Sequence, residues 1–179
     1  MLKIVLISLA VIVVVFIVVV SLQPTDFRIA RSATIAAPPA IIFAHVNDLH
    51  KFQDWSPWAK IDPNSKIVYE GPQEGTGAKF SWAGNKEVGE GAMTVTDSHP
   101  SDRIQFRLDF KKPFEATNTA EFTFKPEGDG TAVTWAMSGR NNFMFKAVGL
   151  FMNCDKMVGG QFEKGLADLK TLAEAEAKK

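Results

Sequence analysis

The side chains able to do acid–base chemistry are few and scattered along the 179 residues of this chain. Asp155 falls on an apolar helical stripe. It is therefore either a pocket acid or a solvated residue at a helix start, where the helix dipole favours a carboxylate. His45 and Tyr69, the one tyrosine, complete the candidates for a general acid or base. The sequence has no nucleophile elbow, phosphate-binding loop, dinucleotide fingerprint or zinc-protease helix, so we predict no catalytic residue set.

Histidine and cysteine offer no metal-binding pattern. His45 and His50 are five residues apart, which places them on different faces of a helix, and His99 stands before a proline. The single Cys154 excludes an internal disulfide and a multi-cysteine site. Its residue type favours a small, buried apolar role over that of a catalytic thiol. We expect no metal and no cofactor.

Aromatic residues give the strongest signal, and they leave two interpretations open: a well-packed core, or the lining of an apolar cavity. Small residues indicate either close backbone approach or space left for a guest. Ala116 and Ala120 lie on the inward face of one predicted strand, and Gly159, Gly160 and Gly165 lie in a predicted helix. Each such glycine costs about 1 kcal/mol relative to alanine. The residues that we predict to line the cavity are Trp55, Trp58, Phe80, Trp82, Phe106, Ala120, Phe122, Trp135, Asp155 and Phe162.

The elements that must position these residues begin with seven strands. The alternation of apolar and polar residues is clearest in Arg103–Phe110, where Ile104 and Phe106 face inward. Gly128-Asp129-Gly130 is a hairpin turn signal. The predicted strands are Phe27–Ala36, Lys66–Glu70, Ala78–Ala83, Glu87–Asp97, Arg103–Phe110, Ala116–Lys125 and Thr131–Ser138.

Helical spacing marks three further segments of the same region. Ala40–Leu49 follows two prolines that suit a helix start, and His50–Ala59 is a second short helix or irregular segment. Apolar residues from Phe151 to Ala173 recur every three or four residues, with one gap of seven, and this spacing predicts a long amphipathic helix. Strands with one polar face form a half-solvated antiparallel sheet, and the long helix must cover its other face. We predict an α+β fold.

The N-terminal segment is apolar throughout. Ser8 is the only polar residue from Ile4 to Val20, and a helix of this length comes close to the roughly 30 Å of a bilayer core. A retained anchor and a cleaved signal peptide both fit, but the run exceeds the usual signal-peptide core, so we predict an anchor. Positive charges stand on both sides of the span, which leaves the orientation open. We expect a bacterial inner membrane, with the domain on the periplasmic side.

Composition limits the partners of the domain. Lysine plus arginine and aspartate plus glutamate are equal at twenty each, which argues against a nucleic-acid partner because such proteins carry a basic patch. We divide the chain into an anchor at residues 1–22, a linker at 23–26, one domain at 27–175 and a charged tail at 176–179. The short linker keeps the domain near the membrane surface.

The order of elements resembles that of the SRPBCC superfamily, the START-like and polyketide cyclase-like helix-grip proteins. The resemblance includes a Trp55-Ser56-Pro57-Trp58 segment and Asp62-Pro63 before the second strand, and it covers about Phe27–Ala175. It implies a curved antiparallel sheet of six or seven strands around a long C-terminal helix, with two short helices after the first strand and an apolar cavity. It also implies that the domain binds a lipid, a sterol, a polyketide or another hydrophobic ligand. The family has no universal set of catalytic residues to transfer to this chain.

Three functions follow from these observations. The first is a membrane-tethered binding or carrier domain for a hydrophobic small molecule such as a lipid, isoprenoid or polyketide. The second is a cyclase- or dehydratase-type enzyme that uses Asp155, His45 or Tyr69 as a pocket acid or base. The third is an interaction module for another membrane protein, which an exposed apolar patch on the outer sheet face would favour.

Overall fold

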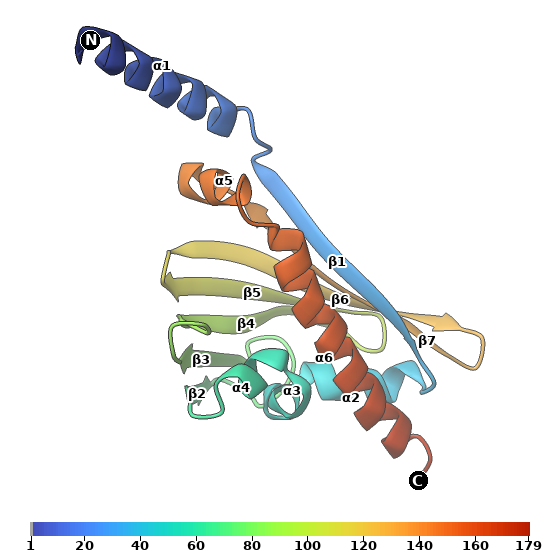
Figure 1. Ribbon diagram of the computed structural model, residues 1–179. Coiled ribbons are helices and arrows are strands. Elements are labelled where there is room, and N and C mark those ends of the chain that lie inside the picture. Colours follow the sequence, from blue (N-terminus) through green and yellow to red (C-terminus); the bar gives the residue numbers. More distant parts are fainter. Residues whose placement is uncertain (1) are drawn as a thin grey trace.

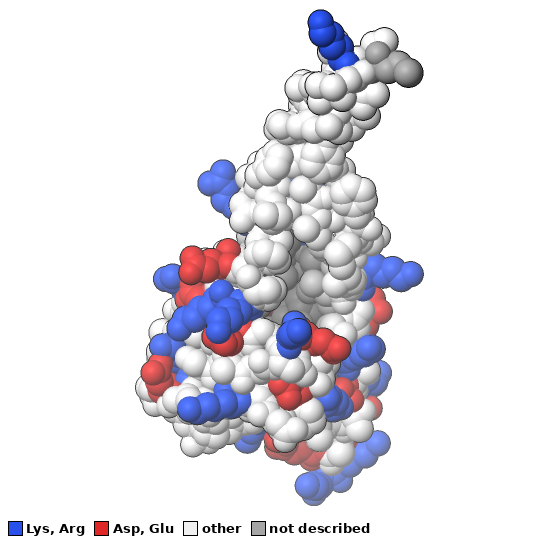
Figure 2. Space-filling view, turned by 60° about the vertical axis from the view of Figure 1, so that its left-hand side comes forward, with Lys and Arg blue, Asp and Glu red and all other residues white. Residues whose placement is uncertain are grey.

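The computed structural model describes residues 2–179 and begins with one helix that stands apart from the domain (Figure 1). Helix α1 (Leu2–Ser21) is 20 residues long and almost wholly exposed, and only its last turn is covered, at Val20. Its length and composition suffice to cross a membrane, and a signal sequence has the same properties. Figure 2 shows an uncharged surface along this helix up to Lys3, while acidic and basic side chains mix over the domain.

The domain is built on one antiparallel sheet of seven strands in the order β1-β7-β6-β5-β4-β3-β2. Strand β1 therefore lies at one edge of the sheet and β2 at the other. From β2 to β7, each strand pairs with the next one in the sequence, and β1 pairs with β7. Alternating burial along β5, where Ile104 and Phe106 are fully buried, shows one solvated face and one covered face. The strands are β1 (Asp26–Ile35), β2 (Lys66–Glu70), β3 (Lys79–Ala83), β4 (Glu90–His99), β5 (Arg103–Lys112), β6 (Ala116–Glu127) and β7 (Gly130–Arg140).

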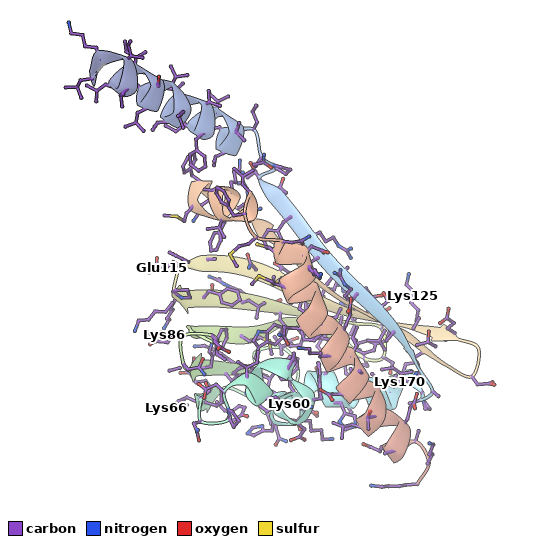
Figure 3. All side chains as sticks on the ribbon, in the orientation of Figure 1. Lys60, Lys66, Lys86, Glu115, Lys125 and Lys170 are labelled. Carbon is purple, nitrogen blue, oxygen red and sulfur yellow. The ribbon has the colours of Figure 1, made fainter. Side chains whose placement is uncertain are left out.

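The long helix α6 (Cys154–Glu176) crosses the covered face diagonally (Figure 1). Polar contacts hold it at both sides: Lys170 Nζ donates to the carbonyl oxygen of Thr34 in β1 at 2.9 Å, and Lys60 pairs with Asp168 at 2.6 Å (Figure 3). The short helices α2 (Pro39–Asn47), α3 (Leu49–Trp55) and α4 (Pro57–Ile61) cover the rest of this face. A further helix, α5 (Phe143–Gly149), lies beside the end of α1.

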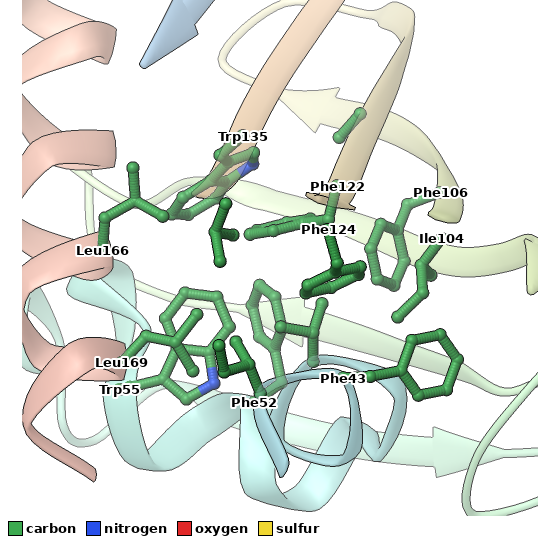
Figure 4. Packing of buried hydrophobic residues seen from close by; sticks show 14 of the residues in the cluster. Phe43, Phe52, Trp55, Ile104, Phe106, Phe122, Phe124, Trp135, Leu166 and Leu169 are labelled. Atoms are coloured by element: carbon green, nitrogen blue, oxygen red, sulfur yellow. The ribbon is translucent and has the colours of Figure 1, made fainter. Parts of the chain in front are cut away.

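The core lies between the sheet and these helices. Phe52, Trp55, Phe106, Phe122 and Trp135 gather in one aromatic cluster, with Leu166 and Leu169 of α6 at its side (Figure 4). The rings meet mostly edge to face, which suits aromatic pairs because of their quadrupoles. The sequence-based α+β helix-grip fold is confirmed.

Three details differ from the sequence expectations. Three short helices follow β1, because the non-helical backbone of Ser56 and the proline that follows it divide the predicted His50–Ala59 segment into α3 and α4. Buried Asp48 separates α2 from α3 and caps α3 by accepting hydrogen bonds from the His50 and Lys51 amides. Helix α5 was not expected. Helix α6 begins at Cys154, where the Asn153 side chain accepts from the Lys156 amide, so Phe151 precedes it and is exposed.

Candidate functional site

A cavity of about 210 Å³ lies between the sheet and helices α3, α4 and α6. Twenty residues line it, and none of them carries a charged side chain. Only Gln53, Ser56 and Ser65 are polar. Apolar cavities of comparable size in proteins hold small hydrophobic guests, so the cavity has the chemistry of a hydrophobic ligand site.

Trp135 of β7 forms the wall of the cavity next to α6. Its ring stacks on Phe162 at a centroid distance of 4.2 Å and on Phe122 at 4.8 Å, and it meets Trp58 edge to face. Gly165 makes this arrangement possible. A Cβ atom there would lie 2.8 Å from Trp135 Cζ3, inside van der Waals contact. The glycine in α6 therefore serves close packing against the indole.

Trp82 of β3 forms the opposite wall in the same manner. It is paired with Gly91 of β4, and a Cβ on that glycine would lie 2.5 Å from Trp82 Cζ2. The pairing of β4 with β5 shifts register at Glu90/Gly91, as a β-bulge does. The indole Nε1 donates to the carbonyl oxygen of Val88 at 3.3 Å, which fixes the ring at the rim.

Eight of the ten residues predicted to line a pocket do line this cavity. They come from α4, four strands and α6, and the structure brings them together around one space. That they bind a ligand stays a prediction. These residues are Trp58, Phe80, Trp82, Phe106, Ala120, Phe122, Trp135 and Phe162.

Trp55 and Asp155 do not line the cavity. Trp55 is fully buried behind it, and its indole nitrogen donates to the His45 carbonyl oxygen at 3.0 Å. Asp155 lies on the exposed first turn of α6, where it accepts hydrogen bonds from Arg31 of β1. These hydrogen bonds lower the pKa of Asp155. A solvated carboxylate at a helix start is thus the interpretation that the structure supports.

The other two candidate acid–base residues also lie outside the cavity lining. His45 Nε2 lies 2.8 Å from Glu176 at the far end of α6. Tyr69 is partly exposed, with its ring stacked on His50 at 3.8 Å. Burial and the nearby carboxylates of Asp48 and Asp54 raise the pKa of Tyr69. The three candidates therefore share no site.

Cys154 corrects another expectation, since it is exposed at the start of α6 and is not a buried apolar residue. Its surroundings form a second feature of the site. A second cavity of about 780 Å³ lies between β1, β6, β7, α5 and the first turns of α6, and it shares Met137 and Val158 with the first. Unlike the first, it is also lined by charged side chains: Asp26, Arg28, Arg140, Lys146 and Asp155. The segment of α5 and the start of α6 also exposes large apolar side chains: Phe143, Met144, Leu150, Phe151, Met152 and Met157.

Sequence reasoning missed several lining residues. Leu108 and Phe110 lie on the inward face of β5, as the alternation of this strand predicts, but they were not included among the predicted lining residues. Val158 lies one turn before Phe162 on the apolar stripe of α6. Gln53 and Ser65 carried no such signal, because polar residues in short helices and loops are usually solvated.

Comparisons with known proteins agree with this geometry. No curated protein matches the chain. Among solved structures, protein CV1439 from Chromobacterium violaceum is 15% identical and covers 85% of this chain and 99% of its own, with a TM-score of 0.59. The Aha1 dimer from Colwellia psychrerythraea is 15% identical, covers 83% and 96%, and also scores 0.59. These identities show a shared fold alone.

A third neighbour comes from the steffimycin biosynthetic pathway. The di-domain ARO/CYC StfQ of the steffimycin pathway is 12% identical, with a TM-score of 0.61 over 87% of this chain and 53% of its own. The model of the family described as polyketide cyclase/dehydrase and lipid transport matches residues 26–174, which is nearly the whole domain. This chain therefore belongs to the polyketide cyclase/dehydrase and lipid transport family.

Proposed function

We propose that this protein is a membrane-tethered binding or carrier domain for a hydrophobic small molecule, held in the cavity between the sheet and α6. One observation carries the proposal: a cavity of about 210 Å³ whose lining has no charged side chain and only three polar ones. Transfer of an apolar molecule from water into such a space is favourable in proportion to the apolar area that it buries. The family description, which includes lipid transport, agrees with this chemistry.

The dimensions of the cavity limit the ligand. A protein cavity of about 150 Å³ binds benzene, so 210 Å³ suits about eight or nine non-hydrogen atoms at the same density. A longer lipid, isoprenoid or polyketide-like chain would extend past Met137 and Val158 into the second cavity, which adds about 780 Å³. The two cavities together offer room for one such molecule.

The membrane part of the proposal is supported by the position of α1. The end of α1 packs against α5, and the exposed apolar segment at α5 and the start of α6 lies directly below it (Figure 1). With α1 in a bilayer, this segment would face the lipid, and the second cavity behind it would open there. We place α1 in a bacterial inner membrane with the domain in the periplasm. Protease accessibility in intact spheroplasts tests the side, and protection of the domain would refute it.

Catalysis of the cyclase or dehydratase type is the second candidate, because the family description names it. Acid–base chemistry would require an ionisable group within hydrogen-bonding reach of the bound substrate. In the described part of the chain, none of the twenty residues that line the first cavity is ionisable, and His45 and Tyr69 line neither cavity. Asp155 lines the second cavity, where its carboxylate accepts hydrogen bonds from Arg31. We therefore place binding ahead of catalysis. The outer sheet face is polar at β5, so the interaction module has less support.

The experiment uses the full chain purified in lipid nanodiscs, with native mass spectrometry of co-purified apolar molecules. Ala120 lies in the cavity lining, and Ala120→Leu fills part of the space. Ala132 lies on the other face of β7, so Ala132→Leu adds the same atoms outside the cavity. We expect guests on the wild type and on Ala132→Leu and a loss of occupancy on Ala120→Leu. Equal occupancy in both variants, or no guest on any chain, would refute the proposal.

A further inference from the structure

Two polar atoms in the cavity wall have no hydrogen-bond partner within the described part of the chain. They are Gln53 Nε2 and Ser65 Oγ, and both are buried from solvent. Most buried polar atoms in proteins are hydrogen-bonded, and a buried polar atom without a partner costs folding free energy. Two such atoms lining one apolar cavity call for an explanation, and a bound ligand supplies it.

The three polar lining residues come from elements at one end of the domain. Gln53 is on α3, Ser56 lies between α3 and α4, and Ser65 immediately precedes β2. Ser65 Oγ lies under the connection between β3 and β4, since a Cβ atom built on Gly84 would be 3.0 Å from it. Helices α3 and α4 and strand β2 occupy the end of the domain away from α1 and α5 (Figure 1).

The opposite end of the cavity is apolar. Val158, on the first turns of α6, and Met137, on β7, border the second cavity on the side of α5. A ligand that spans the first cavity thus meets hydrogen-bonding groups at one end and only apolar side chains at the other. Such a distribution fits an amphipathic molecule with one polar group.

The charge of that polar group follows from the lining. None of the lining residues is a lysine, arginine, histidine, aspartate or glutamate. An ionised carboxylate, phosphate or amine would lose its hydration without a counter-charge, and this is strongly unfavourable. A neutral carbonyl or hydroxyl oxygen, in contrast, accepts hydrogen bonds from an amide N–H and from a serine hydroxyl.

We propose that Gln53 and Ser65 form the polar end of the ligand site and donate hydrogen bonds to the oxygen of a neutral, otherwise apolar ligand, such as a ketone, ester or alcohol. The proposal rests on the proposed function, because it assumes a hydrophobic guest in this cavity. It adds the functional group that the guest must carry and the direction in which the guest lies, with its oxygen toward α3 and its apolar part toward α5.

The test compares two ligands that differ only at this oxygen. 2-Octanone has about the number of non-hydrogen atoms that the volume of the first cavity suits, and 2-methyl-1-octene replaces its carbonyl oxygen by a methylene group. Binding to the full chain in nanodiscs is measured by tryptophan fluorescence, because Trp58, Trp82 and Trp135 line the cavity. Each variant is compared with the wild type for the same ligand, so partition of the ligand into the disc cancels.

We expect Gln53→Leu to weaken the binding of 2-octanone about tenfold, the loss of one hydrogen bond, and to leave 2-methyl-1-octene unchanged or bound more tightly. Ser65→Ala is expected to act in the same direction by a few fold. Gln161→Leu on α6, outside the cavity lining, is the matched control and should change neither ligand. Retained binding of the alkene reports that each variant is folded.

The possible failures are distinguishable. If both ligands bind and Gln53→Leu and Ser65→Ala affect them equally, the polar end is refuted while the hydrophobic site stands. If octanoate at pH 8 binds more tightly than 2-octanone, the neutral character of the ligand is refuted. If neither 2-octanone nor 2-methyl-1-octene binds the wild type, the proposed function fails together with this inference.

Discussion

Two glycines on α6 differ only in what surrounds them, and this difference makes a quantitative prediction. At Gly165, an added Cβ would lie 2.8 Å from Trp135 Cζ3 and 3.0 Å from Pro57 Cδ. At Gly160, five residues earlier in the same helix, no heavy atom lies within 4 Å of an added Cβ. Alanine at either position gains the same helix propensity, about 1 kcal/mol.

The steric term then separates the two variants. The Trp135 ring cannot move freely away from a Cβ at position 165, because it stacks on Phe162 and Phe122 and meets Trp55 and Trp58 edge to face. Overpacking a core in this way costs about 1–3 kcal/mol. Gly160→Ala should therefore stabilise the domain by about 1 kcal/mol. Gly165→Ala should range from neutral to destabilising by about 2 kcal/mol, so the variants differ by about 1–3 kcal/mol.

Thermal unfolding of the full chain in nanodiscs, followed by tryptophan fluorescence, measures the difference. For a domain of this size, 1 kcal/mol shifts the melting temperature by about 2–4 °C. Gly160→Ala should melt above the wild type and Gly165→Ala clearly below Gly160→Ala. A Gly165→Ala variant as stable as Gly160→Ala would refute the packing argument, because the indole would then have room to yield.

Two further predictions concern charge and membrane contact. Hydrogen bonds from Gln73 and from the α3 amides outweigh burial and lower the pKa of Asp48. The ionised carboxylate therefore stabilises the fold above its unfolded pKa near 4 and loses this effect as the pH falls through the lower folded pKa. Asp48→Asn keeps a good N-cap residue. Its free energy of unfolding in urea should be lower than that of the wild type by about 1 kcal/mol at pH 6, and this difference should shrink at pH 3. A difference that does not depend on pH would contradict a stabilising ionised carboxylate at Asp48. A polarity-sensitive dye on the exposed Cys154 should emit at shorter wavelength in nanodiscs than the same dye on a control chain, Lys178→Cys with Cys154→Ser. Phe151→Asp should reduce this difference in wavelength. Equal spectra at the two positions would contradict contact of the apolar segment of α5 and the start of α6 with lipid.

Much of the fold could be predicted from local periodicity. Alternation in β5 placed Ile104 and Phe106 on the covered face, and both are fully buried. The ends of the helices were harder to predict from the sequence, because they depend on capping by side chains. Asn142 and Asn153 accept hydrogen bonds from the first turns of α5 and α6, and neither is distinguishable in sequence from an asparagine in a loop.

The candidate site could also be predicted only in part. Large aromatic residues on inward strand positions must be covered by something, so Trp82, Phe106 and Trp135 could be assigned to the interior before the structure was known. Asp155 lies on the apolar stripe of α6 in the sequence, but Arg31 of β1, distant in the chain, holds it away from the first cavity, at the wall of the second. The polar end formed by Gln53 and Ser65 depends on how α3, α4 and β2 pack together, and no local pattern records that.

The energy of an empty cavity connects the fold with its proposed ligand. If the 210 Å³ were dry and vacant, a cavity term near 24 cal/mol per Å³ would correspond to roughly 5 kcal/mol. That is comparable with the whole stability of a typical domain, about 5–15 kcal/mol. A sequence that retains Ala120 beside such a space sacrifices stability that a larger residue could have supplied. A guest restores much of it, since ligand at a hundred times its dissociation constant adds about 2.7 kcal/mol. With the proposed guest, occupancy and folding would be linked in this domain, and a bilayer that holds α1 would be the nearest reservoir of apolar molecules.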